Sequence, residues 1–294
     1  MKQRFNHFAQ TTYLPGFQGF SLFEVGSIFI EGLQKGAITN RASSVAFNSF
    51  LALFPATIFL FTLIPFIPIH NFQSALFDLI KEVMPKAGFE AAEETIIDIV
   101  HHQHKKMLSI GFLSALYFST NGVHSMIDGF NNSYHQIETR SFIRQRLVSL
   151  ALVIIVTIVL IATIAIIIFT EVKIGRLPKS HYGIYLIQLG RLISVFILFL
   201  VVISFNYFLG PASKQGWQFF SPGSILATCL SLLTSFAFAY YVNHFGKYNK
   251  LYGSIGTLLI VMMWMYLNCL VILVGFELNA SIQSVNAIKN QKPI

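Results

Sequence analysis

The stretch from Tyr248 to Ile282 decides the fold class, and its sequence is YNKLYGSIGTLLIVMMWMYLNCLVILVGFELNASI. From Ile255 to Phe276 it contains no charged residue. Because a helix rises about 1.5 Å per residue, a segment of this length crosses the roughly 30 Å hydrocarbon core of a bilayer. Two of its polar side chains, Asn268 and Glu277, need partners in other helices or in water, since polar groups are costly in lipid. The stretch therefore predicts a membrane-spanning helix over residues 255–282.

The composition of the whole chain supports this interpretation. Of its 294 residues, 54% are hydrophobic and only 11% are charged, and the mean hydropathy is +0.65. This balance is typical of a polytopic membrane protein. The net charge is +8, but the basic residues are scattered among the connecting segments, which favours anionic lipid over nucleic acid as a partner. Cys229 and Cys269 lie inside apolar runs, so we expect two buried, inert thiols.

The apolar pattern predicts an all-α fold, a polytopic helical bundle in a single membrane domain over residues 1–294. Six transmembrane helices are expected at about residues 45–69, 107–127, 147–170, 184–209, 222–244 and 255–282. Residues 21–35 form an amphipathic helix that lies in the membrane interface or docks under the bundle. Residues 71–106 form amphipathic helices in an extracytoplasmic loop, split at Pro85 and Gly88.

The second expected span is the least apolar one, and its polar residues gather on one side. On a helical wheel a narrow arc holds Ser114, Asn121, Ser125, Asp128 and Asn132, and His124 widens it. This face either makes hydrogen bonds to other helices or forms a wall of a polar cavity. A cavity would bring the arc together with the remaining polar candidates of the bundle, which are Asn48, Asn206, Asn268 and Glu277.

Glu277 is expected to pair with an arginine, because a carboxylate that borders hydrocarbon needs a cationic partner. The candidates, which are also candidate lipid-headgroup contacts, are Arg41, Arg140, Arg144 and Arg146. A metal site at His101, His102 and His104 is a weaker alternative than a solvated helix end, because no second ligand cluster is visible. We expect no catalytic residue, no metal and no cofactor.

Six spans place both termini on the same side of the membrane. With cytoplasmic termini, ten Lys or Arg residues lie inside and nine outside, with Arg191 in a span. This difference does not decide the orientation by the positive-inside rule. The arginine cluster at positions 140, 144 and 146 favours cytoplasmic termini.

Several short motifs together resemble a known family. They are Ala42–Phe47 with Leu53–Pro55, Asn131–Arg140 with Arg146, Tyr207 with Pro211, Ser221–Gly223, Tyr252–Gly256, Trp264–Tyr266 and Gly275–Ala280. From about Gly32 to Ile282 the chain resembles the YihY/virulence factor BrkB family of bacterial inner-membrane proteins, once described as ribonuclease BN-like. Phe276 and Phe47 depart from the small residue and the tyrosine expected there. The resemblance implies six spans, cytoplasmic termini and a transport-like role, and it implies no catalytic residue.

Three functions follow as hypotheses. The first is transport, namely export or flipping of a lipid or other amphiphilic envelope component, with membrane lipids and a lipid-like substrate as partners. The second is a nuclease, which is disfavoured because metal-dependent nucleases need clustered carboxylates or histidines, and only Asp128 and Glu277 border the spans. The third is a non-transporting membrane scaffold or envelope-integrity factor. No nucleic-acid partner is expected, and assembly into a homo-oligomer stays open.

Overall fold

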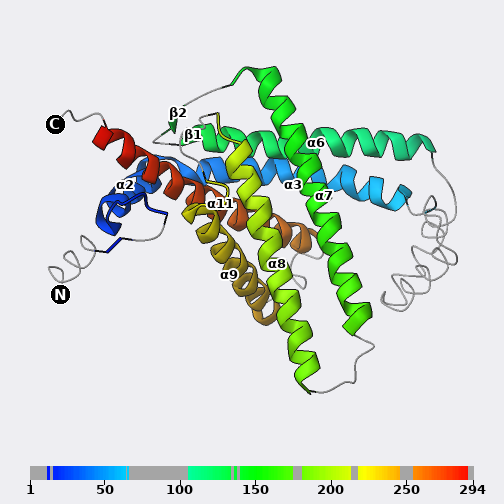
Figure 1. The fold of residues 1–294 in the computed structure, drawn as a ribbon. Helices are drawn as coiled ribbons and strands as arrows, with labels where there is room; N and C mark the ends of the chain where they lie inside the picture. Colours follow the sequence, from blue (N-terminus) through cyan, green and yellow to red (C-terminus); the bar gives the residue numbers. More distant parts are fainter. Residues whose placement is uncertain are drawn as a thin grey trace. The chain divides into compact units, whose positions relative to one another are not determined.

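The described part of the chain consists mainly of helices, with one pair of short strands (Figure 1). The structure is a computed structural model that describes residues 12–13, 16–63, 65, 105–133, 136–137, 140–174, 181–212, 218–245 and 254–290. Its helices are α2 (Leu22–Lys35), α3 (Ile38–Leu63), α6 (Lys105–Asn131), α7 (Phe142–Ile174), α8 (His181–Leu209), α9 (Pro222–Phe245) and α11 (Ser254–Asn290). Strands β1 (Asn132–Ser133) and β2 (Gln136–Ile137) pair in antiparallel fashion. The expected all-α class is confirmed.

The chain divides into two compact units. The first contains residues 1–47 and 122–294, and the second contains residues 48–121. Within the second unit the later part of α3 lies close to the early part of α6: a Cβ on Gly111 would lie 3.2 Å from the Phe59 backbone. The expectation of a single membrane domain over residues 1–294 stays a prediction.

Five described helices are long and apolar enough to cross a membrane. The candidate spans are Ile38–Phe59, Phe142–Thr163, Leu192–Leu209, Pro222–Val242 and Leu258–Asn286. Large apolar side chains such as Ile158, Leu233 and Phe236 are exposed on them, which marks a lipid-facing surface. The predicted second span does form helix α6, but its serine, asparagine and histidine side chains keep it out of this set. The expected count of six is therefore not confirmed.

The helix boundaries differ from the predicted ones at several ends. Helix α11 continues to Asn290, so Glu277 lies inside the helix and not at its end. Helix α3 begins at Ile38, ahead of the predicted start of the first span. A polar residue can continue a helix as long as its backbone N–H and carbonyl make helical hydrogen bonds. Hydropathy therefore locates the ends of these helices poorly. The predicted loop helices before residue 105 and the three histidines lie outside the described residues.

The amphipathic segment at residues 21–35 forms α2, which docks on α11. Ser21 and Glu24 make a capping box at its start, and the N–H of Gly36 donates to the Gly32 carbonyl at its end. Val25 is fully buried in a cluster with Ile282 and Val285 of α11, among others. Of the two arrangements predicted for this helix, the structure has the docked one.

The core of the first unit gathers residues of α3, α6, α8, α9 and α11 around a group of aromatic rings. The Phe130 and Phe276 rings stack with centroids 4.4 Å apart, and Tyr207 meets both rings edge-on. The Tyr207 hydroxyl donates to the backbone carbonyl of Ile272. Offset and edge-on aromatic pairs are favourable arrangements, so this group ties α6, α8 and α11 together.

Helices α9 and α11 approach each other closely because small residues line their crossing. A Cβ on Gly223 would lie 2.1 Å from the Gly275 carbonyl oxygen, and a Cβ on Gly275 would lie 2.6 Å from the Ala227 Cβ. Small residues at such positions let membrane helices pack backbone to backbone. Cys229, on a side of α9 that this contact leaves open, is exposed, so the prediction of buried thiols holds for Cys269 but is wrong for Cys229.

Candidate functional site

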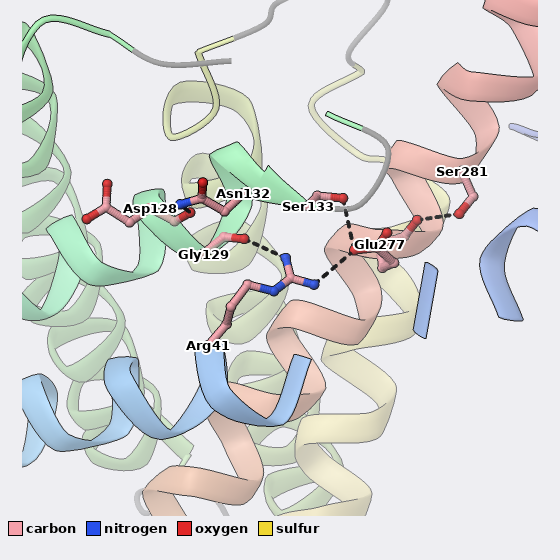
Figure 2. A network of polar contacts seen from close by, with 7 residues as sticks. All are labelled: Arg41, Asp128, Gly129, Asn132, Ser133, Glu277 and Ser281. Atoms are coloured by element: carbon pink, nitrogen blue, oxygen red, sulfur yellow. Dashed lines mark hydrogen bonds and ion pairs between the residues drawn. The ribbon is translucent and has the colours of Figure 1, made fainter. Parts of the chain in front are cut away.

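A buried carboxylate on α11 is the meeting point of three parts of the chain (Figure 2). Glu277 is 0% exposed, and its Oε2 accepts hydrogen bonds from Nη2 of Arg41 at 3.3 Å and from Oγ of Ser133 at 2.9 Å. Arg41 belongs to the start of α3 and Ser133 to β1. The prediction that Glu277 pairs with one of the four candidate arginines is confirmed, and the partner is Arg41.

Arg41 uses its second terminal nitrogen to reach α6. Its Nη1 donates to the Gly129 carbonyl oxygen at 2.7 Å, and its side chain is only 11% exposed. The glycine that ends α2 makes room for it, since a Cβ on Gly36 would lie 2.9 Å from Nη2. The guanidinium therefore bridges α6 and α11 from the base of α3, as the planar group of an arginine is suited to do.

Ser133 reaches Glu277 because the chain changes direction directly after α6. Strand β1 follows the last residue of α6, and Asn132 and Ser133 pair with Ile137 and Gln136 of β2. This pairing exposes the Asn132 side chain and buries the Ser133 side chain completely. Sequence analysis missed Ser133, since a strand of two residues has no periodicity that a pattern could reveal.

This arrangement stabilises the first unit only while both charges are present. Removing a carboxylate or a guanidinium from water costs several kcal/mol, and mutual attraction with good hydrogen bonds offsets that cost. If one partner is removed, the other charge stays buried and the loss is about 3–5 kcal/mol. The pair therefore specifies how α3, α6 and α11 meet, and it is more than an incidental surface contact.

Asp128, the other acid that borders a predicted span, has a different environment. Its side chain is 50% exposed, its Oδ1 accepts a hydrogen bond from Nε2 of Gln145, and His124 lies 3.6 Å from its Oδ2. Asn132 donates to the backbone carbonyl of Asp128 at 2.9 Å. Asp128 therefore faces the start of α7, and sequence analysis missed its partner Gln145.

The other predicted cavity residues are either bonded within their own helix or partly buried. The side-chain amides of Asn206 and Asn268 donate to carbonyls of their own helices, at Val202 and Trp264. Four more are partly buried, namely Asn48, Ser114, Asn121 and Ser125.

A pocket of about 20 Å³ lies at the start of α9, lined by Gly16, Gln18, Gln218, Ser221, Pro222, Asn279, Ile282 and Gln283. It has room for a water molecule, and none of the predicted cavity residues lines it. The polar cavity stays a prediction.

The remaining candidate arginines have separate contacts. Arg140 donates to the carbonyls of Leu209, Gly210 and Pro211, where α8 ends and a cation is favourable. Burial lowers the pKa of Arg140, and the charge of Arg144 lowers it further. A guanidinium nevertheless stays charged at neutral pH. Arg146 lies 5.3 Å above the Phe142 ring, whereas Arg144 is exposed.

Residues 29–293 of the chain match the family described as Virulence factor BrkB. The protein belongs to the BrkB family. Among its relatives, YfkH of Bacillus subtilis, whose name describes it as ribonuclease-like, is 27% identical over 86% of this chain and 93% of its own length. A UPF0761 membrane protein of Mannheimia succiniciproducens is 26% identical over 90% and 91%, and one of Aggregatibacter aphrophilus is 21% identical over 90% and 93%. No solved structure matches the chain.

The motifs behind the BrkB resemblance supply several of the buried polar contacts. Gly275–Ala280 contains Glu277 and Asn279, and Asn131–Arg140 contains Ser133. Asn279 binds the motif Ser221–Gly223: its Oδ1 accepts from the Gly223 N–H at 2.8 Å, and its Nδ2 donates to the Ser221 Oγ at 2.7 Å. Motifs far apart in this BrkB chain therefore come together through hydrogen bonds.

Proposed function

We propose that this BrkB family protein is a transporter of the bacterial inner membrane that exports or flips a lipid or other amphiphilic envelope component. The observation that carries the proposal is Asp128, a carboxylate of α6 whose side chain is 50% exposed, in a bundle whose outer surface is apolar. Ionisable residues are expensive inside a membrane, and where they occur they mark substrate or ion pathways by default. The protein is proposed to be no enzyme.

Helix α6 is the sixth span in this proposal, and both termini are cytoplasmic. The helix has 27 residues and is therefore roughly 40 Å long, enough to cross the hydrocarbon core. Its polar residues would be tolerable there if they face other helices or a wet path. Asp128 supports such a path, because half of its side chain is exposed.

The path proposed for the headgroup follows the polar arc of α6 from Ser114 to Asn132. Transporters hold polar headgroups at sites between helices and shield them from the acyl core. Asp128 would attract a cationic headgroup and repel an anionic one, and it would thereby contribute to selectivity. The pair of Arg41 and Glu277 would keep the framework around the path in place.

The second candidate function is a non-transporting scaffold. It is favoured by the hydrogen bond from Gln145 to Asp128, because a scaffold would use the arc of α6 for contacts between helices. A nuclease, the function that the name of the Bacillus subtilis relative suggests, is less well supported. Glu277 would have to bind a metal ion, but its Oε2 accepts hydrogen bonds from Arg41 and Ser133.

Lipid translocation in liposomes tests the proposal. The purified protein is reconstituted with fluorescent phosphatidylethanolamine, phosphatidylglycerol or a lipid-linked sugar, and the fraction of label reached by an external quencher is followed in time. Transport predicts faster translocation of at least one lipid than in protein-free liposomes, with a changed headgroup preference in Asp128→Asn. Rates equal to those of empty liposomes for every lipid would reject the transport proposal in favour of the scaffold.

Cysteine labelling from outside intact cells tests the six-span topology. Single cysteines replace Gln3 and Ser180 in a chain whose Cys229 and Cys269 are changed to serine. With six spans and cytoplasmic termini, only position 180 reacts with an impermeant maleimide. Reaction only at position 3 would invert the orientation. Equal behaviour of the two positions would mean that α6 does not cross the membrane.

A further inference from the structure

Helix α7 exposes a continuous apolar ridge on one side. The ridge consists of Ile143, Leu147, Ala151, Ile154, Ile158 and Ile161, all exposed. Their spacing of three or four residues places them along one face of the helix. The other face carries Gln145, Ser149 and Leu152, which are 5%, 0% and 0% exposed. From its first to its last residue the ridge is about 27 Å long, close to the thickness of the hydrocarbon core.

An exposed arginine lies beside the ridge where it begins. Arg144 directly follows Ile143, the most exposed residue of the ridge at 73%. At 100° per residue its side chain leaves the helix about 60° from that of Leu147 and about 20° from that of Ala151, on the ridge side of α7. It makes no ion pair with any residue of the described ranges. An unpaired cation thus lies at the end of a surface that needs acyl chains to cover it.

Arg144 differs from the other three candidate arginines, each of which has a contact within the chain. Arg140 binds the end of α8, Arg41 binds Glu277, and Arg146 lies over the Phe142 ring. The nearby carboxylate of Asp128 is bonded to Gln145, on the buried face of α7. Of the four candidate headgroup contacts, Arg144 is therefore the one that is exposed and has no ion-pair partner in the part of the chain that the structure describes.

We propose that the α7 ridge and Arg144 together bind an anionic phospholipid, with the acyl chains along the ridge and the phosphate against the guanidinium. The half of the ridge next to Arg144 matches the acyl region of one leaflet, which is about 15 Å thick, and the cation fits the phosphodiester of that lipid. A guanidinium matches phosphate geometry through paired N–H donors. A basic residue near a membrane surface attracts anionic headgroups. This binding does not depend on transport, so a negative translocation assay leaves it intact.

Native mass spectrometry of the purified full-length protein tests the proposal. The protein in detergent is titrated with dioleoyl phosphatidylglycerol or with dioleoyl phosphatidylcholine, and the occupancy of lipid adducts is measured. Wild type is expected to prefer phosphatidylglycerol, and Arg144→Gln to lower its apparent affinity roughly fivefold. Phosphatidylcholine binding should not change. Absence of any preference for phosphatidylglycerol in the wild type would overturn the proposal.

Arg146→Gln is the matched control, because it removes the same charge two residues further along the same helix. It is expected to lower phosphatidylglycerol binding by a clearly smaller factor than Arg144→Gln. Equal losses in the two variants would mean that diffuse positive charge attracts the lipid, and the assigned site would be wrong. Displacement of the lipid by millimolar inorganic phosphate would instead identify a site for a soluble anion, and it would also overturn the proposal.

Discussion

Helices α11 and α6 both carry polar residues, but they use them differently. On α11, Glu277 and Asn279 are 0% and 4% exposed, and each bonds to other parts of the chain. On α6, Thr120 donates to the carbonyl of Leu116 in its own helix, and the Asp128 side chain is 50% exposed. The comparison teaches that polar residues in the helices of this protein can be structural joints, which hold parts of the chain together, or available surface. Burial and partners distinguish these roles, whereas residue type does not.

Neutralising one carboxylate on each helix should give the largest difference. Glu277→Gln leaves the Arg41 charge buried and is expected to lower the free energy of unfolding by about 3–5 kcal/mol. Asp128→Asn changes an exposed site and is expected to cost about 0–1 kcal/mol. Equilibrium unfolding of both variants by sodium dodecyl sulfate in mixed micelles measures the difference.

A double variant separates the ion pair from a general loss of packing. Combining Arg41→Gln with Glu277→Gln removes both charges, so part of the stability lost in Glu277→Gln should return. Equal destabilisation by Glu277→Gln and Asp128→Asn would contradict the distinction between joint and surface. A double variant whose loss of stability equals the sum of the losses in Arg41→Gln and Glu277→Gln would deny the coupling between the two residues.

The close contact of α11 with α9 should be sensitive to a single methyl group. Gly223→Ala places a Cβ 2.1 Å from the Gly275 carbonyl oxygen, so the helices must separate. Overpacking of this kind costs about 1–3 kcal/mol. The control is Gly26→Ala in α2, where no atom lies within 4 Å of the added Cβ and helix propensity favours alanine by about 0.5–1 kcal/mol. Thermal unfolding should shift in opposite directions in the two variants, and a shared direction would refute the packing argument.

The contrast between the two helices also explains what sequence could predict. The helices arise from long apolar runs, which are local, so five of the six predicted spans coincide with helices that can cross a membrane. The need of Glu277 for a cation was predictable from its place beside hydrocarbon. Its actual partner was not, because Arg41 is 236 residues away and only the packing of α3 selects it from four arginines. The contacts of Ser133 and Gln145 were not predictable either. The first depends on a strand of two residues and the second on how α7 packs against α6, and neither produces a periodic sequence pattern.

Removing one side-chain amide from α11 and one from the end of α6 should give a smaller difference in the free energy of unfolding. Asn279→Ala leaves the Gly223 N–H without its acceptor in a buried position, at a cost of about 1–3 kcal/mol. Asn132→Ala affects an exposed side chain that bonds to the turn before it, so the change should stay within about 0.5 kcal/mol. Unfolding in mixed micelles again compares them. A larger loss for Asn132→Ala would place a structural joint at the end of α6 instead.

The smallest effects on stability should come from cysteine substitutions at the exposed polar positions of α6, which report on access to water. In a chain without Cys229 and Cys269, Asp128→Cys and Asn132→Cys are expected to react quickly with a maleimide, because these side chains are half-exposed and exposed. Ile127→Cys is the control and should react slowly, since Ile127 is 0% exposed.

Ser125→Cys then decides between the two proposed functions. Ser125 is partly buried, so reaction at position 125 in liposomes would extend the wet surface along the polar arc, as a headgroup path requires. Protection at positions 125, 128 and 132 alike would remove the path from this face, and α6 would then be a structural joint like α11.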